Sequence, residues 1–524
     1  MDLRNVQVIG GGPAGLFAAT LLRRAMPAVS VTVHERSVPD ETFGFGVAFT
    51  RRTLDALEGA DDAVVAELRR ASIPMPAQEM RIGGASILNT GNQGGITIAR
   101  SALLKALLAQ ARAAGVEVRL GSRATLSQLA EGVDLVIAAD GVASATRAQI
   151  APLVGAHVQQ GRGLFMWLGC DKRLDTNLFA PVPTEAGLFN IHCYPYSEDR
   201  STIGVETDMT TWLRAGMKTW ADQTPADASD DRSIAYLQGV FGGVLDGARL
   251  LGNRSRWAHF RTVTVDRWSH DNVVLIGDAA HTAHYSVGSG TKMAMEDAAS
   301  LVTALQTAPS VGLTAALTAY EAKRRPRVEK LQTLADRSRW WWESLAERVS
   351  LPPPVLMVAY LSRGGVISTT RLAESDPALL RSALSCAGLD ADAGDPGRVA
   401  TQIVANPIRL GGGAPTSRIL ADTDDLEVYE LAAEISDPWG EEAAALVRKA
   451  QAFDPTGAGV MVLTGSLTRE ALLDRLAVAE HVRKRCRLPV AVDTTTHYLD
   501  DVADGIVAGR IDMVRFTDLL SQPK

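Results

Sequence analysis

A glycine-rich turn near the start of the chain is the first segment whose residue types and spacing suggest chemistry. Residues 6–10 have the pattern of an apolar strand and residues 13–26 that of a helix, and between them stands GGGPAG, in which Pro13 and Ala14 separate Gly12 from Gly15. In such a unit the first glycine, Gly10, permits a tight turn. The second lets a pyrophosphate approach the backbone, and the third allows close packing of helix on strand. The helix N-terminus then offers N–H donors and a partial positive charge to phosphates.

An acidic residue follows this turn at the distance that nucleotide binding needs. The strand-like residues 29–35 end on Glu35, about 20 residues after the last glycine, where a carboxylate can bind both hydroxyls of a ribose. We therefore predict dinucleotide binding, although this motif does not distinguish NAD from FAD.

Two further motifs each place an aspartate after a buried strand. Asp140 begins DGVASATR (140–147), and Asp278 lies in GDAAH (277–281). Arg100 opens an amphipathic helix after ITIA, and the glycine-bearing loop 288–292 (GSGTK) leads into another helix, whose N-terminus would place backbone N–H groups and a positive dipole end together. Either aspartate alone could be a turn residue at a strand end, but the three motifs occur in a fixed order.

The elements that must position these residues alternate between strand and helix, which predicts a parallel sheet with helices around it. We expect a nucleotide-binding domain made of residues 1–154 and 266–350, with an antiparallel substrate domain inserted at 155–265, where shorter alternating runs replace the parallel-strand pattern. At 524 residues the chain is too long for one compact core.

A different organisation is expected after residue 350. Three prolines in LPPPV cannot continue a helix, so residues 351–375 are predicted to be a linker, and residues 371–411 are poorly patterned. The last 65 or so residues follow a β-α-β-α-β pattern, which predicts a separate C-terminal α/β domain at 376–524.

Composition excludes several classes of function. The 53 basic and 60 acidic residues give a formal charge of −7 without a basic block, which argues against nucleic acid as a partner. No apolar run is long enough for a membrane span, and the first residues lack a signal-peptide layout, so we expect a cytoplasmic protein with no membrane partner. The four cysteines form no CxxC pair, and no GxSxG, HExxH or metal-ligand spacing occurs.

The three motifs together resemble those of the FAD-dependent aromatic hydroxylases, which have the fold of p-hydroxybenzoate hydroxylase. The resemblance implies FAD as cofactor, NADH or NADPH and O₂ as co-substrates, and ring hydroxylation through a C4a-hydroperoxyflavin. It places Asp278 near the flavin ribityl and pyrophosphate, Arg100 near the phosphates, and the loop 288–292 near the N1/O2 edge of the ring. The residues that it assigns to the cofactor are Gly10, Gly12, Pro13, Ala14, Gly15, Glu35, Arg36, Gly46, Arg100, Asp140, Asp278, Gly288, Ser289, Gly290 and Thr291.

Four longer stretches narrow this resemblance: ETFGFGVAF (41–49), residues 194–212, residues 277–298 and SRWWWESLAERV (338–349). They are similar to a subgroup that contains the salicylyl-CoA 5-hydroxylases, the 2-aminobenzoyl-CoA monooxygenases and the violacein-pathway hydroxylases. The subgroup implies a small-molecule aromatic CoA thioester as substrate, preferably salicylyl-CoA converted to gentisyl-CoA. 2-Aminobenzoyl-CoA and a free or otherwise conjugated aromatic remain alternatives. The oligomeric state stays open.

The C-terminal residues resemble the end of an old-yellow-enzyme-like (β/α)₈ barrel, which binds FMN in some members of the subgroup. Residues 371–524 are too few for a closed barrel, which needs roughly 200–250 residues. Where the barrel pattern has a Gly-Arg pair at the FMN phosphate, this chain has Arg515-Phe516-Thr517-Asp518. We therefore expect a shortened barrel remnant without FMN.

Polar residues beside the flavin motifs are the candidates for a catalytic role: His281, His284 and Tyr285. His284 and Tyr285 stand where many hydroxylases have a proline, and Lys292 where many have an asparagine. Tyr194 and Tyr196 in the inserted sheet are weaker candidates, since tyrosines in sheets usually pack. The run 340–342 (WWW) is interpreted as packing.

Three other functions remain possible from the sequence. A flavin halogenase would share the N-terminal motif, but the chain has no WxWxIP sequence. A non-hydroxylating FAD reductase would not need to react with O₂, and a non-catalytic flavin-binding scaffold would bind FAD without substrate-stimulated NAD(P)H oxidation.

Overall fold

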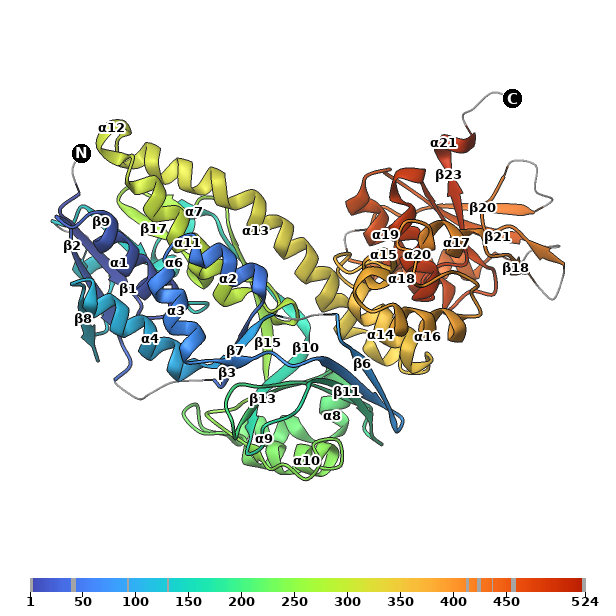
Figure 1. Ribbon diagram of the computed structural model, residues 1–524, viewed down its shortest axis with the longest axis horizontal. Helices are drawn as coiled ribbons and strands as arrows, with labels where there is room; N and C mark the ends of the chain where they lie inside the picture. Colours follow the sequence, from blue (N-terminus) through green and yellow to red (C-terminus); the bar gives the residue numbers. More distant parts are fainter. Residues whose placement is uncertain are drawn as a thin grey trace. The chain divides into compact units, whose positions relative to one another are not determined.

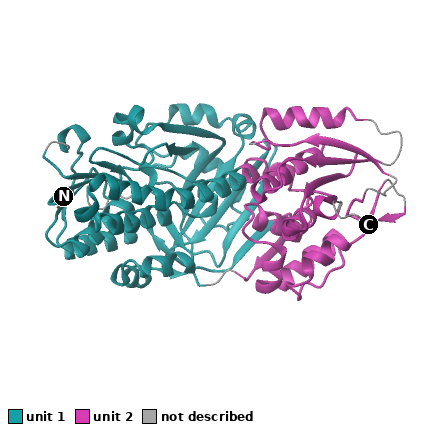
Figure 2. Ribbon diagram, turned by 90° about the horizontal axis from the view of Figure 1, so that it is seen from above, with its two compact units in different colours: residues 1–81, 92–339 teal, residues 82–91, 340–524 magenta. Residues whose placement is uncertain are grey.

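The computed structural model describes residues 3–38, 44–91, 94–129, 132–410, 414–421, 426–435, 437–453 and 459–520 (Figure 1). The chain divides into two compact units, Met1–Arg81 with Asn92–Arg339 and Ile82–Gly91 with Trp340–Lys524 (Figure 2). In the described part of the chain, no helix has both the length and the apolar character needed to cross a membrane.

A parallel sheet forms the centre of the first unit, in the order β16-β17-β9-β1-β2-β8. Its strands β1, β2, β8, β9 and β17 run parallel, and the short β16 pairs antiparallel with β17. Buried valines and leucines fill β1, β2, β9 and β17, as expected for strands covered on both faces. Their bounds are β1 Asn5–Ile9, β2 Ser30–Glu35, β8 Glu117–Leu120, β9 Leu135–Ala138, β16 Ser269–His270 and β17 Val273–Leu275.

Helix α1 (Pro13–Ala25) packs against both α4 (Arg100–Ala113) and α11 (Gly290–Leu305), which brings three motif-bearing segments together. A small sheet β3-β7-β4 precedes α4. The other elements around this sheet are β3 Gly46–Phe49, α2 Arg51–Glu58, α3 Asp62–Arg70, β4 Ile73–Pro74, β7 Ile96–Ala99, α5 Leu126–Leu129, α6 Ala145–Gln149, α7 Ala151–Val154, η1 Gly277–Ala279, η2 Tyr285–Val287, α12 Ala308–Val311 and α13 Leu313–Glu343.

A second, largely antiparallel sheet confirms the predicted insertion, in the order β14-β10-β13-β12-β11-β5, with β15 beside β10. The sequence analysis did not anticipate β5, which comes from before the insertion and pairs parallel with β11. The strands are β5 Gln78–Ile82, β10 Ala156–Cys170, β11 Asn177–Pro183, β12 Leu188–Pro195, β13 Ser201–Thr207, β14 Leu250–Leu251 and β15 Ala258–Val265.

The two faces of this antiparallel sheet differ. One face carries an apolar core, including Met166, Ile191 and Val205, that packs with Leu237 and Phe241 of α10. Helices α8 (Met209–Arg214), α9 (Met217–Gln223) and α10 (Asp231–Phe241) lie together on that side (Figure 1). Because side chains alternate along a strand, the intervening residues project from the opposite face.

The second unit contains a four-stranded parallel sheet in the order β20-β21-β22-β23, which confirms the predicted β-α-β-α-β run and adds one strand before it. Sequential neighbours in one direction are also the arrangement in a β/α barrel. The elements are β6 Ala85–Asn89, η3 Leu345–Glu347, α14 Pro353–Ser362, α15 Thr369–Ser375, α16 Pro377–Ala387, α17 Val399–Ala405, β18 Ile408–Arg409, β19 Pro415–Thr416, β20 Glu427–Ala432, α18 Glu441–Gln451, β21 Gly459–Thr464, α19 Arg469–Arg483, β22 Val490–Thr494, η4 Thr496–Tyr498, α20 Leu499–Val507, β23 Met513–Phe516 and α21 Thr517–Leu520.

The segment expected to be a linker, residues 351–375, contains the two helices α14 and α15. Pro353 and Pro354 occupy the first turn of α14, where a missing N–H costs nothing, so these prolines begin a helix. Residues 371–411, which looked poorly patterned, contain α16, α17 and part of α15. The unit boundary also falls within α13, so residues 340–350 group with the C-terminal unit rather than with the nucleotide-binding one.

A buried ion pair ties α19 to the segment before α14. Arg348 donates to Glu480 at 2.6 Å, and both side chains are 2% exposed. The Arg348 guanidinium also lies over the rings of Trp341 and Trp439. Burial raises the pKa of Glu480, but Arg348 and Lys484 outweigh it, so the pKa is lowered and the carboxylate stays ionised.

Glu480→Ala is predicted to lower the free energy of unfolding by about 3–5 kcal/mol, because it leaves the Arg348 charge buried without its partner. Urea denaturation followed by tryptophan fluorescence measures the loss. The exposed Glu442→Ala on α18 is the control and should change stability by no more than about 0.5 kcal/mol. Equal stability of both variants would show that the pair does not hold α19 in place.

Candidate functional site

The glycine turn has the geometry that its three glycines require. Gly10 has a φ of +106°, which side-chain-bearing residues rarely adopt. A Cβ on Gly15 would collide with the carbonyl oxygen of Gly10, so the helix could not pack as closely. A Cβ on Gly12, by contrast, would meet no protein atom within 4 Å. The open space at the second glycine is therefore the place where a phosphate could approach the N-terminus of α1.

Glu35 is fixed against this turn. One of its carboxylate oxygens accepts a hydrogen bond from the backbone N–H of Gly11 at 2.7 Å, and the other accepts from the N–H of Ser37 at 2.8 Å. Arg36, next to it, is exposed. The two backbone bonds orient the carboxylate at the end of β2 and leave lone pairs that could accept from ribose hydroxyls.

Asp140 organises the turn after β9 instead of facing outward. Its carboxylate accepts from the hydroxyl of Ser144 at 2.5 Å and from the N–H of Thr146 at 3.0 Å. The buried Arg147 then donates to the carbonyl oxygens of Asp278 (3.2 Å) and Ala279 (3.0 Å). Arg147 thus connects the second motif to the third, a role that the sequence analysis did not assign to it.

Asp278 and Arg100 face each other as partly desolvated charges. Burial raises the pKa of Asp278, while His281 and Arg100 oppose that shift. Burial likewise lowers the pKa of Arg100, opposed by Asp278 and Tyr194. Within the described ranges the Arg100 guanidinium makes no hydrogen bond and no ion pair within 4.0 Å, so its donors remain available to an anionic group such as a phosphate.

The loop before α11 presents an electropositive end. Gly288 has a φ of +62°, and a Cβ on Gly288 or Gly290 would meet nothing within 4 Å. The Ser289 hydroxyl is buried, and no described residue bonds to it. Together with Thr291 in the first turn of α11, this loop offers free N–H groups, an unpaired hydroxyl and open space, which fit the electron-rich edge of a flavin.

His281, which is expected among the catalytic groups, lies in a buried network behind the GDAAH turn. Its Nε2 lies 2.7 Å from Asp297, and its side chain is 2% exposed. Asp297 also accepts from the backbone N–H of Gly277 at 3.0 Å and from Arg324 at 2.8 Å. Burial raises the pKa of Asp297, but His281 and Arg324 outweigh it and lower the pKa overall.

In this network one carboxylate holds both the His281 ring and the Gly277 N–H that precedes Asp278, while no described residue bonds to the Nδ1 of His281. The sequence analysis missed Asp297 and Arg324. They lie about 20 and 45 residues further along the chain, and only helix packing brings them to the turn.

His284 and Tyr285 lie in an aromatic cluster at the antiparallel sheet. Their rings stack at 4.2 Å, and the ring of Tyr285 lies 5.0 Å from Phe165 and 5.2 Å from Trp167 of β10. Phe260 of β15 contacts both rings. The Nδ1 of His284 lies 2.8 Å from the Ser286 hydroxyl. The segment between the GDAAH turn and the 288–291 loop therefore meets an aromatic surface.

Gly46 and the two candidate tyrosines meet at β3. The Tyr194 hydroxyl donates to the carbonyl oxygen of Gly46 at 2.9 Å, and a Cβ on Gly46 would lie 2.7 Å from the Cβ of Tyr196. Burial raises the pKa of the Tyr194 phenol, so it stays protonated. These residues hold the strand beside Arg100. The stretch 41–49 begins outside the described residues, at 41–43.

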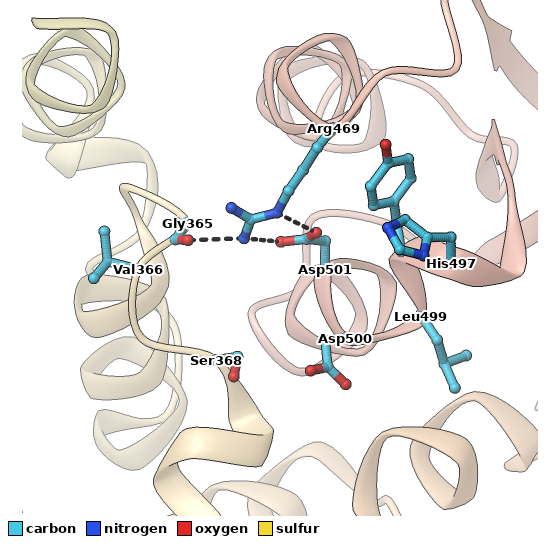
Figure 3. Close-up of a pocket in the computed structure, with 9 residues that line it drawn as sticks. Gly365, Val366, Ser368, Arg469, His497, Leu499, Asp500 and Asp501 are labelled. Atoms are coloured by element: carbon cyan, nitrogen blue, oxygen red, sulfur yellow. Dashed lines mark hydrogen bonds and ion pairs between the residues drawn. The ribbon is translucent and has the colours of Figure 1, made fainter. Parts of the chain in front are cut away.

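The second unit contains a pocket of about 360 Å³, lined by residues of the loop before α15, the start of α19 and the start of α20 (Figure 3). Arg469 donates to both carboxylate oxygens of Asp501 at 2.7 and 2.8 Å, and to the carbonyl oxygen of Gly365 at 2.8 Å. Because Asp501 neutralises the guanidinium, this pocket lacks the free cation that a phosphate site needs. None of the sequence motifs falls here.

The comparisons with known proteins agree with this geometry. The FAD binding domain family matches residues 4–335. Salicyloyl-CoA 5-hydroxylase from Streptomyces sp is 36% identical over 97% of this chain and 99% of its own length. The 3-hydroxy-4-methyl-anthranilyl–aryl-carrier protein 5-monooxygenase of Streptosporangium sibiricum is also 36% identical, over 70% of this chain and 97% of its own length. The solved structure of 2-methyl-3-hydroxypyridine-5-carboxylic acid oxygenase, 21% identical, shares the fold with a TM-score of 0.51 over 73% of this chain and 98% of that chain.

Gly12→Val is predicted to lose most bound FAD while the protein stays folded, because the side chain enters the open space at the turn, where its Cβ would meet no protein atom within 4 Å. Asp278→Ala should also lose FAD. Flavin absorbance per chain and far-ultraviolet circular dichroism measure the two properties. Gly15→Val is the matched control: its Cβ collides with the backbone, so it should unfold the domain as well. Full FAD occupancy in Gly12→Val would contradict a phosphate at this turn.

Three motifs, the open space at Gly12 and the electropositive loop before α11 all fit one dinucleotide that carries a flavin. The matched family and the relatives point to the same cofactor and to one kind of reaction. The chain belongs to the FAD binding domain family and is an FAD-dependent aromatic-ring monooxygenase that uses NAD(P)H and O₂.

Proposed function

We propose that this enzyme hydroxylates an aromatic acyl-CoA, namely salicylyl-CoA to gentisyl-CoA at ring position 5. The observation that carries the proposal is the similarity to a salicyloyl-CoA 5-hydroxylase along 97% of the chain, C-terminal unit included. The carrier-protein relative, by comparison, matches only 70% of the chain. A plain aromatic hydroxylase need not have a C-terminal unit of this kind, so the whole-chain match favours the CoA thioester.

The proposed cofactor contacts follow from the geometry above. Gly10, Gly12 and Gly15 with the start of α1 hold the pyrophosphate, and Glu35 holds the ribose. Arg100 and Asp278 face the phosphates and ribityl chain, and the loop 288–291 faces the flavin ring. Bound FAD, once reduced by NAD(P)H, supplies the activated oxygen, which is the chemically demanding part of the reaction.

The protein's own contribution is to place the substrate ring and exclude water from it. We propose that His284 and Tyr285, with the aromatic residues around them, hold the ring. Position 5 is para to the 2-hydroxyl group, which donates most electron density there, and the thioester is meta-directing, so the substrate activates its own reacting carbon. No metal or protein nucleophile is needed for this step.

The substrate assignment predicts rapid NADH oxidation with salicylyl-CoA and formation of gentisyl-CoA, with the free acid at least about tenfold slower because it lacks the CoA binding energy. Absorbance at 340 nm and mass spectrometry of the product measure both. 2-Aminobenzoyl-CoA and a carrier-bound aromatic serve as competing substrates in the same assay. Equal turnover of free salicylate, or none of the thioester, would overturn the CoA assignment and leave the hydroxylase intact.

We also propose that the second unit is a barrel remnant without an FMN site. Arg515, which stands near the position expected for a phosphate-binding arginine, is held by Asp493 at 2.7 and 2.8 Å and by Glu430 at 2.5 Å. Both carboxylates hold its charge at the C-terminal end of β23, so a phosphate would have to displace two ion pairs.

Flavin released by heat denaturation should therefore be FAD alone, at about one equivalent per chain. Chromatography separates FAD from FMN. Protein prepared with added FMN tests whether FMN stays absent even when it is supplied. FMN near one equivalent per chain would show a working second flavin site, and ring reduction would then accompany hydroxylation.

A further inference from the structure

A buried asparagine in the middle of the antiparallel sheet has no hydrogen-bond partner. Asn190 of β12 is 3% exposed, and neither its Nδ2 nor its Oδ1 is bonded to any residue that the structure describes. Buried polar groups are almost always paired, and an unpaired one costs stability. An amide with both ends unpaired is therefore a candidate for hydrogen bonding to a ligand.

Strand register places Asn190 on the face of the antiparallel sheet opposite to the one that α8, α9 and α10 cover. It pairs across the sheet with Pro181 of β11 and Glu206 of β13, and Glu206 in turn pairs with Phe165 of β10. Its neighbours in sequence, Phe189 and Ile191, point into the opposite core. Asn190 consequently shares its face with the aromatic residues of β10.

Trp167 extends the aromatic surface toward Asn190. A Cβ on Gly204 would lie 3.1 Å from Cζ3 of Trp167, so the indole lies across β13 at its glycine. Gly204 pairs with His192, two residues from Asn190 on the same face of β12. The other edge of Trp167 contacts Tyr285 at 5.2 Å, next to the loop that leads to the flavin-facing start of α11. The amide and the proposed ring site thus lie along one surface.

We propose that Asn190 is the residue that selects the neutral, ortho-substituted acyl group of the substrate; this assignment rests on the proposed function. Its Nδ2–H donates to the thioester carbonyl oxygen, and its Oδ1 accepts from the ortho O–H of the ring. One amide has the donor and the acceptor that this edge of the substrate requires.

The charges on this face select against the free acid. Glu206 is beside Asn190, and the residues that the continuous register of β11–β13 with the 164–170 part of β10 places on this face (Phe165, Trp167, Gly169, Asn177, Phe179, Pro181, Pro183, Leu188, Asn190, His192, Tyr194, Thr202, Gly204 and Glu206) include no lysine or arginine. A free carboxylate would therefore find no cation among these strand residues to balance it, which is costly at a desolvated site. A thioester carries no charge and avoids this penalty.

Asn190→Leu tests the assignment, because leucine has a similar volume and no polar atoms. The melting temperature of the substrate-free enzyme should equal or exceed that of the wild type, since two unpaired polar atoms are removed. The kcat/KM for salicylyl-CoA should fall about tenfold to hundredfold, as two hydrogen bonds are lost and the substrate's groups are left unpaired. FAD content should stay at one equivalent, and discrimination between salicylyl-CoA and benzoyl-CoA in binding should shrink.

Asn272→Leu is the matched control, because its amide does bond, to the carbonyl oxygen of Val133 at 2.8 Å. It should lower the melting temperature and leave the discrimination between the two thioesters unchanged. For Asn190→Leu, an unchanged kcat/KM, or a fall that accompanies a lower melting temperature, would overturn the assignment. Failure of the wild-type enzyme to prefer the thioester would show in the wild-type data alone, and would overturn the proposed function together with this inference.

Discussion

The carboxyl ends of β1, β2, β9 and β17 meet at one edge of the parallel sheet, and the rest of the cofactor site depends on this constraint. Parallel strands with helical crossovers must deliver each following loop to that same edge. The glycine turn follows β1, Glu35 ends β2, Asp140 follows β9 and the GDAAH turn follows β17. Motifs that are more than 100 residues apart in the chain thereby meet at one edge of the sheet.

Buried charges then fix how these loops face one another. Arg147 bonds the loop after β9 to the backbone of the loop after β17, and Asp297 holds Gly277 and His281 from the side of α11. Each of these charges is satisfied by the protein. Arg100 and the Ser289 hydroxyl, in contrast, have no hydrogen-bond partner in the part of the chain that the structure describes. Groups with partners in the protein build the site, whereas groups without such partners are available to a ligand. Asn190 is of the second kind.

In the second unit, ion pairs occupy the strand ends at which a complete β/α barrel would bind a phosphate group. Its four parallel strands keep the sequential order of a barrel, but Arg515, Asp493 and Glu430 neutralise one another at the strand ends, as Arg469 and Asp501 do in the nearby pocket. These pairs leave no free cation among them. The similarity to salicyloyl-CoA 5-hydroxylase nevertheless extends through this unit, because it covers 97% of the chain.

The sequence by itself determined the cofactor, the parallel sheet and the inserted antiparallel sheet, because spaced glycines, strand-end acids and hydrophobic periodicity are local signals. It did not reveal that residues 351–375 contain α14 and α15, since proline breaks the interior of a helix and its fit in a first turn depends on the preceding residue's conformation. Only the tertiary structure decided the surroundings of His281 and Asn190. Asp297 from a later helix pairs with His281, and strand register leaves Asn190 without a partner among the described residues. Neither the partner nor its absence is encoded in the residues that flank them.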